Sequence, residues 1–214
     1  MVLVGTYLFS AFNGTQVAAE VQIGLFALVL LLAMRNSLLP GRWPLVIGTV
    51  TAAGSAAAFG AALTGTSAGA GVADLWKALV LLLTAAMIVR RVLAKPTVTI
   101  QSIYGALSAY LIVGLMFAAC YAAIQQLGRT SFFADNQPVN AQTLQYFSFT
   151  TLTTLGYGDF TAAGSDGRSI AVLEAMTGQV FLATLVARLV SAYRGPDRSL
   201  PEDVDGPGDD EDRD

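Results

Sequence analysis

The sequence predicts an all-α integral membrane protein with about five transmembrane helices and one re-entrant half-helix. Three observations support this fold class. Of the 214 residues, 54% are apolar and only 13% are charged, whereas a soluble domain has about 25% charged residues. The apolar residues gather into five runs, each close to the roughly 20 residues that a helix needs to cross a bilayer. A shorter segment with a different pattern lies between the last two runs.

The five runs define the expected spans. They cover residues 17–34, 44–63, 72–89, 103–124 and 169–190. Prolines lie at the ends of the runs and not in their interiors, as helix geometry requires. The second run has no charge and is rich in small residues, which let helix backbones approach closely in lipid. We therefore expect it to pack against other helices.

Lysine and arginine residues predict the orientation, because cytoplasmic loops of membrane proteins carry them in excess. Most of them flank the spans on one side: Arg35, Arg42, Arg90, Arg91, Lys95, Arg188, Arg194 and Arg198. The segments 64–71 and 125–168, on the other side, hold only Arg129 and Arg168. We expect a multi-pass protein of the cell membrane with its N-terminus outside and its C-terminal tail in the cytoplasm.

The composition excludes several classes of function. The chain has no histidine and only one cysteine, Cys120, which excludes histidine catalysis, an intrachain disulfide and a multi-cysteine metal site. No Walker-type phosphate loop is present, so an ATP-driven pump is not supported. We expect no enzymatic activity, no cofactor and no nucleic-acid partner.

The last 20 residues differ from the rest of the chain. Residues 195–214 carry nine acidic residues and two arginines, a charge of −7, so the total of −3 leaves +4 for the first 194 residues. With three prolines and no apolar pattern, this segment has the composition of a disordered tail.

The segment between the last two spans predicts the re-entrant half-helix. A polar stretch, 125–140, precedes residues 141–153, and Asn140 is a favourable N-cap residue. At 1.5 Å per residue the segment reaches about 20 Å, which is too short to cross the hydrocarbon. Such a helix is tolerated in a membrane where protein buries it or water meets it.

A nine-residue motif follows directly. The sequence Thr-Leu-Thr-Thr-Leu-Gly-Tyr-Gly-Asp over residues 151–159 resembles the TxxTxGYGD selectivity-filter signature of the potassium channel family. The resemblance implies a two-helix pore domain at 98–194, with an outer helix 103–124, a pore helix 141–153, a filter 154–158 and an inner helix 169–190. Residues 1–97 would form an N-terminal membrane region with about three helices. Ala162 stands where the family often has proline, so we expect a looser outer loop.

The resemblance assigns a role to each filter residue. Four main-chain carbonyl groups, with the Thr154 hydroxyl, would replace the hydration shell of K+. These carbonyls belong to Thr154, Leu155, Gly156 and Tyr157. Gly156 and Gly158 would adopt the backbone angles that turn successive carbonyls toward one axis.

Other residues would support the filter. Tyr157 would point away from the axis and brace the filter against Tyr146 and Phe147. Asp159 would lie at the outer mouth, hold the filter and attract cations. Thr151, which opens the motif, belongs to the same supporting set.

The inner helix has three features of interest. Glu174 is costly in a membrane unless it is paired or wetted, so we expect it to bond behind the pore helix, with Thr150 or Thr151 as its partner. Gly178 matches the position of a hinge glycine in such channels, although close helix packing would explain it equally well. A stripe at helical spacing would line the cavity below the filter or form a seam between subunits. Its members are Gln179, Leu182, Val186 and Val190.

The function that the resemblance implies is passive, selective K+ conduction. A ring of carbonyls needs four filter segments, and this chain has one, so we expect a homotetramer in the lipid bilayer. A voltage sensor needs regularly spaced arginines along a span, and none of the spans has them. The alternative is a non-conducting regulatory or accessory subunit of a potassium channel or uptake system.

Overall fold

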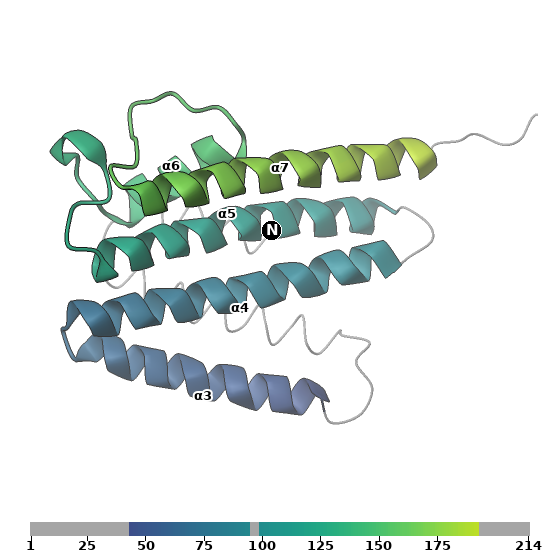
Figure 1. The fold of residues 1–214 in the computed structure, drawn as a ribbon. Helices are drawn as coiled ribbons and strands as arrows, with labels where there is room; N and C mark the ends of the chain where they lie inside the picture. The colour runs from purple at the N-terminus through teal and green to yellow at the C-terminus, as the bar shows by residue number, and fades with distance from the viewer. Residues whose placement is uncertain (1–42, 95–98, 193–214) are drawn as a thin grey trace, which may run out of the picture.

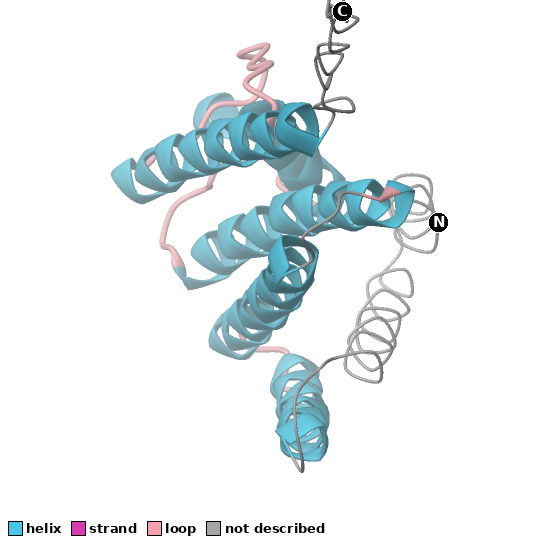
Figure 2. Ribbon diagram, turned by 90° about the vertical axis from the view of Figure 1, so that its right-hand side faces the viewer, coloured by secondary structure: helices cyan, strands magenta, loops and turns pink. Residues whose placement is uncertain are grey.

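The structure, a computed structural model, describes residues 43–94 and 99–192. Within these ranges the chain is entirely helical apart from loops and one isolated β-bridge (Figure 2). The elements are α3 (Trp43–Leu63), α4 (Ser67–Ala94), α5 (Ile100–Leu127), η1 (Ala134–Asn136), α6 (Ala141–Leu152) and α7 (Ser165–Ala192). Figure 1 shows the four long helices side by side, with α6 at the end of the bundle where α5 ends and α7 begins. We call this the loop end.

Three of the described helices are long and apolar enough to cross a membrane. They run over Ser67–Ala94, Ile100–Leu127 and Ser165–Ser191. Each is longer than the apolar run that predicted it, because polar residues at its ends continue the helix. The expected span 44–63 corresponds to α3, a 21-residue helix. The expected span 17–34 and the tail 195–214 lie outside the described residues. Helices thus occupy four of the five expected spans, and three of these helices are the candidate membrane spans.

A close contact joins α3 to α4, and an ion pair within α4 neutralises two charges in that span. A Cβ added to Gly54 of α3 would overlap the ring of Trp76, so the glycine admits the indole, whose Nε1 donates to Ser55 Oγ at 3.2 Å. Gly54 therefore packs as expected, whereas most other small residues of α3 are exposed: Ala52, Ala53, Ala56, Ala57 and Gly60. Within α4, Lys77 Nζ lies 2.7 Å from Asp74 Oδ1. The pair removes the net charge that either side chain alone would bring into the span.

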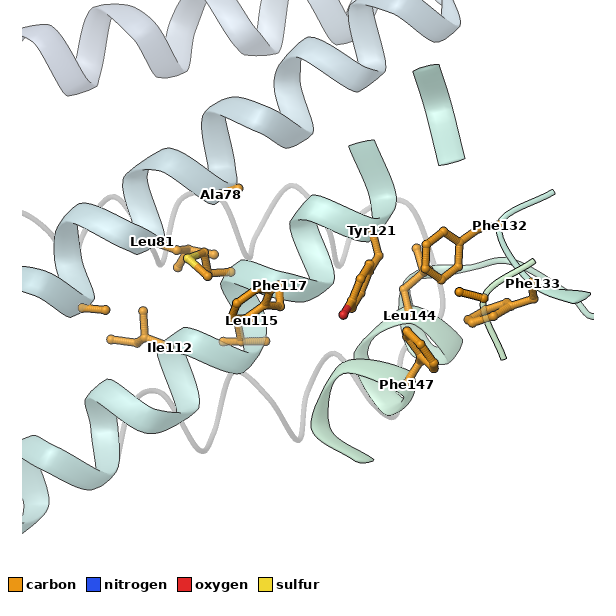
Figure 3. Packing of buried hydrophobic residues seen from close by; sticks show 13 residues of the cluster. Ala78, Leu81, Ile112, Leu115, Phe117, Tyr121, Phe132, Phe133, Leu144 and Phe147 are labelled. Atoms are coloured by element: carbon orange, nitrogen blue, oxygen red, sulfur yellow. The ribbon is translucent and has the colours of Figure 1, made fainter. Parts of the chain in front are cut away.

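The main core lies between α4 and α5 (Figure 3). Ala78 and Leu81 of α4 face Ile112, Leu115 and Phe117 of α5, and all five side chains are buried. This contact fixes α5, which in turn supports α6.

A cluster of aromatic rings fills the loop end. Tyr121 of α5, Phe132 and Phe133 of the following loop, and Phe147 of α6 lie with ring centroids 5.0–5.6 Å apart. Figure 3 shows these rings gathered beside Leu144. Aromatic pairs at such distances add to the packing of the side chains. The cluster therefore joins α5, α6 and the loop between them.

The half-helix α6 begins where the sequence predicts. The side chain of Asn140 accepts a hydrogen bond from the Thr143 amide at 3.0 Å, and Thr143 Oγ1 accepts one from the Asn140 amide at 3.0 Å. This capping box satisfies two otherwise orphaned donors. At 12 residues, α6 is about 18 Å long, as expected for a helix that does not span.

Helix α7 contacts the end of α6 through Gly178. A Cβ added there would collide with the carbonyl oxygen of Leu152, which also accepts a hydrogen bond from the Tyr110 hydroxyl at 3.2 Å. Helix α7 is continuous through Gly178. The structure thus favours the packing explanation of this glycine over the hinge.

We expect Gly178→Ala to lower the free energy of unfolding by about 1–3 kcal/mol, because the methyl group would force α6 and α7 apart. The Tm of the purified protein in detergent measures the loss. Gly60→Ala is the matched control, since an added Cβ at Gly60 in α3 meets nothing within 4 Å. Equal Tm values for the two variants would contradict the contact.

Candidate functional site

The segment after α6 folds back onto the last turn of that helix. The amides of Leu155 and Gly156 donate to the Thr150 carbonyl at 2.8 and 3.1 Å, and the Thr154 amide donates to the Thr151 carbonyl at 2.9 Å. Helix carbonyls at a C-terminus have no partner within the helix. Here the amides of the following segment satisfy them, and Thr151 supports the segment through its main chain.

These bonds determine the direction of the carbonyl groups. The chain has no cis peptide bond among the described residues, and the N–H and C=O of a trans peptide point in opposite directions. Because the amides of Leu155 and Gly156 point at α6, the carbonyls of Thr154 and Leu155 point away from it. They lie on the side where residues 154–158 are exposed.

The backbone of residues 154–158 alternates in handedness. Gly156 and Gly158 have φ of +49° and +79°, as predicted, and Thr154 has φ of +56°. Glycine adopts such angles without steric cost, whereas a β-branched residue there is strained by about 1–3 kcal/mol. The positive φ of Thr154 was not predicted. Its place two residues before Gly156 and four before Gly158, in the same alternating pattern, could have indicated it.

Contacts of its side chain hold Thr154 in this conformation. Its hydroxyl donates to the Thr153 carbonyl at 2.7 Å and accepts a hydrogen bond from Gln179 Nε2 at 3.1 Å. Gln179 belongs to the exposed stripe of α7 that the sequence singles out. The structure therefore brings one member of that stripe to the start of residues 154–158.

The other end of the segment is anchored by Asp159. Its carboxylate accepts a hydrogen bond from the Tyr146 hydroxyl at 2.8 Å, and its carbonyl accepts one from Gln137 Nε2. The bond to Asp159 raises the pKa of the Tyr146 phenol above its ordinary value. Gln137 was not predicted and comes from the loop before α6.

The loop after Asp159 is tied down by main-chain pairing at Ala162, the position where the resemblance led us to expect a looser loop. Phe133 and Ala162 form an antiparallel bridge, with the Ala134 amide 2.9 Å from the Thr161 carbonyl. Arg168 Nε donates to the Ala162 carbonyl at 2.9 Å. Main-chain hydrogen bonds restrain this loop, whereas a proline would restrain it by fixing the backbone angle φ.

Behind α6 lies a buried polar group built on Glu174. This side chain is 0% exposed. Its Oε2 accepts a hydrogen bond from the Tyr121 hydroxyl at 2.5 Å, and its Oε1 lies 2.5 Å from Ser148 Oγ. Ser148 Oγ is also 2.7 Å from the Gly114 carbonyl oxygen. The group joins α5, α6 and α7.

The partners of Glu174 correct the sequence expectation. Glu174 lies behind the half-helix as expected, but it contacts Ser148 and Tyr121 and neither Thr150 nor Thr151. The reason is the register of the two helices. Gly178 meets Leu152, and one turn earlier on each helix Glu174 meets Ser148. Because this register is a contact between two helices, no pattern within either helix could have predicted it.

Phe147 also differs from its expected role. It is buried in the aromatic cluster with Tyr121, Phe132 and Phe133 and does not form a cuff around Tyr157. Neighbouring residues of a helix point about 100° apart, and here Phe147 points into the core while Tyr146 lies toward Asp159. Tyr146 is the one directed toward the segment, and the Tyr157 side chain is 69% exposed.

The remaining residues of the stripe lie on an exposed face of α7. Leu182, Val186 and Val190 are 38%, 57% and 67% exposed. Gln179, the first member of the stripe, forms a hydrogen bond with Thr154.

Comparison with known proteins identifies one match. A family model described as "Ion channel" matches residues 78–194, which is more than half of the chain. The matched range includes α5, α6, α7 and the whole of the motif 151–159. No curated protein and no solved structure matches the chain.

We expect Gly156→Ala to abolish ion flux through the reconstituted protein, because an L-residue at φ of +49° is strained by about 1–2 kcal/mol. The cost is conformational, since an added Cβ meets nothing within 4 Å. Gly164→Ala, equally unhindered and without a positive φ, is the control. Unchanged flux in Gly156→Ala vesicles, with the protein inserted and folded, would show that this backbone geometry is dispensable.

Proposed function

Because the chain belongs to this ion channel family, we propose that it is a pore-forming, potassium-selective subunit through which K+ crosses the membrane passively. Membership of the family also means that the protein is a channel and not an enzyme. The family has the two-helix pore that is typical of potassium channels.

One observation carries the proposal of potassium selectivity. Residues 151–159 match every fixed position of the TxxTxGYGD signature, and they follow a half-helix whose last turn holds the amides of Thr154, Leu155 and Gly156. This leaves main-chain oxygens on the exposed side of the segment. Rings of such oxygens replace the hydration shell of K+ in potassium-selective filters.

In this proposal the K+ ligands are the carbonyls of Thr154, Leu155, Gly156 and Tyr157 and the hydroxyl of Thr154. Positive φ angles at Thr154, Gly156 and Gly158 favour a backbone whose successive carbonyl oxygens point to the same side. The bond from Gln179 to Thr154 Oγ1 fixes the direction of the hydroxyl. A filter of this kind needs no fixed charge, because the dipoles of its carbonyl and hydroxyl oxygens coordinate the cation.

Two electrostatic features assist the cation. The C-terminus of a helix is the partly negative end of its dipole, and α6 ends where residues 154–156 begin. Asp159 is exposed at the far end of the segment and is held there by Tyr146. A cation thus meets negative potential at both ends of the proposed filter.

The proposed channel is a homotetramer. One chain supplies one filter segment, and a closed ring of carbonyls needs four. The face of α7 that carries Leu182, Val186 and Val190 is exposed in the single chain. In the tetramer this face would line the cavity below the filter or meet a neighbouring subunit.

We further propose that the pore domain comprises residues 98–194, that the filter lies on the extracytoplasmic side and that the tail lies in the cytoplasm. The charge pattern of the loops supports this orientation. No described span carries the regular arginines of a voltage sensor; Arg90 and Arg91 lie together near the end of α4. Gating by a strong voltage sensor is therefore not part of the proposal.

The test is flux through the purified protein in vesicles. K+ or Rb+ should pass at least about tenfold better than Na+, and equal Na+ flux would overturn the proposal. Single-channel recording from the protein alone discriminates a conducting subunit from a silent regulatory one. Mass measurement in detergent should give four copies of the 22.4 kDa chain.

A further inference from the structure

The buried group around Glu174 raises a question of proton count. Three oxygen atoms form a hydrogen-bonded chain with the Glu174 carboxyl group: the Tyr121 hydroxyl, Ser148 Oγ and the Gly114 carbonyl oxygen. Ser148 Oγ lies 2.7 Å from the Gly114 oxygen and 2.5 Å from Glu174 Oε1. A serine hydroxyl has a single hydrogen to donate, and a carbonyl oxygen can only accept.

We infer that Glu174 is a neutral carboxylic acid, and that its proton completes a hydrogen-bond relay which positions the pore helix. In this relay Tyr121 donates to Glu174 Oε2, Glu174 Oε1 donates to Ser148 Oγ, and Ser148 donates to the Gly114 carbonyl. Every contact then has one donor and one acceptor. An ionised Glu174 would need the Ser148 hydrogen for itself and would leave the Gly114 contact without a proton.

The surroundings favour the neutral form. Glu174 is 0% exposed, and a buried carboxylate without a cation is costly. The titratable groups of α5 that act on Glu174 are Tyr110, Cys120 and Tyr121, and none of these becomes a cation. Helix α6 faces it with the Ser148 hydroxyl.

Charged groups at the start of α7 and in α4 have partners of their own. Arg168, at the start of α7, donates to the Ala162 carbonyl. Asp74 and Lys77 form an ion pair with each other within α4. No salt bridge to Glu174 is found among residues 43–94 and 99–192.

The relay reaches the filter through α6. Ser148 lies two residues before Thr150, whose carbonyl receives the amides of Leu155 and Gly156. A shift of α6 relative to α5 and α7 would move this carbonyl. Glu174 is therefore a positioning residue for the filter, and this role rests on the function proposed above. Loss of its proton at alkaline pH would place an uncompensated charge behind α6 and disturb conduction.

The decisive variant is Glu174→Gln. Its amide nitrogen can donate to Ser148 Oγ and its amide oxygen can accept from Tyr121, so it reproduces the neutral acid without a titratable proton. We expect its Tm and its K+ to Na+ flux ratio at neutral pH to stay within about twofold of the native values. Glu174→Leu, of similar size, leaves Ser148 and Tyr121 unpaired and should lose the flux ratio.

Two further measurements test the protonation itself. The infrared difference spectrum of native protein minus Glu174→Gln should contain the carbonyl band of a protonated carboxylic acid. As the pH is raised, native K+ flux should fall while the flux of Glu174→Gln stays level over the same range. A carboxylate band at neutral pH, or a Glu174→Gln protein as unstable as Glu174→Leu, would overturn the inference.

The measurements separate this inference from the proposed function. The infrared band and the Tm report the relay without any ion flux. An acid band together with equal K+ and Na+ flux would overturn only the proposed selectivity. A carboxylate band together with selective K+ flux would overturn only the relay.

Discussion

The last turn of α6 is the point on which the rest of the structure depends. Its Thr150 carbonyl receives two amides of the following segment, and its Leu152 carbonyl receives the Tyr110 hydroxyl and abuts Gly178. Carbonyls at a helix C-terminus are normally left to solvent or to a cap. Here they carry the proposed filter on one side and meet two neighbouring helices on the other, so the geometry of residues 154–158 follows from the placement of one turn.

The contacts that place the last turn of α6 are of the kinds that hold helices together in a lipid bilayer. Apolar side chains gain little from burial against one another in a bilayer, so helices associate there through close packing and polar contacts. The chain uses a glycine at the α6–α7 contact, hydroxyl and carboxyl groups behind α6, and aromatic rings at the loop end. The cost of burying Glu174 and Ser148 is offset by hydrogen-bond partners on other helices.

The local features of this fold could be read from the sequence, and the contacts between helices could not. The cap at Asn140 and the left-handed glycines 156 and 158 depend on neighbouring residues, and both were predicted. The partners of Glu174 and the burial of Phe147 depend on the rotation and register of helices, which no local pattern encodes. Apolar runs predicted the three spans but underestimated their length, because helices continue into polar residues. The strain at Thr154 was missed because its support, Gln179, lies 25 residues away.

The contact between Gly178 and Leu152 has a consequence for movement. A glycine in an inner helix is often viewed as a pivot, but a bend at this residue would pull the α7 backbone away from the carbonyl it touches. The portion of α7 up to Gly178 is thus bound to α6 as one rigid unit, with Glu174 and Gln179 on either side of the contact. The portion beyond, from Leu182 onward, has no such attachment to α6. In the proposed channel, we therefore expect a gating movement to involve α7 beyond Gly178 and to leave the contact with α6 in place.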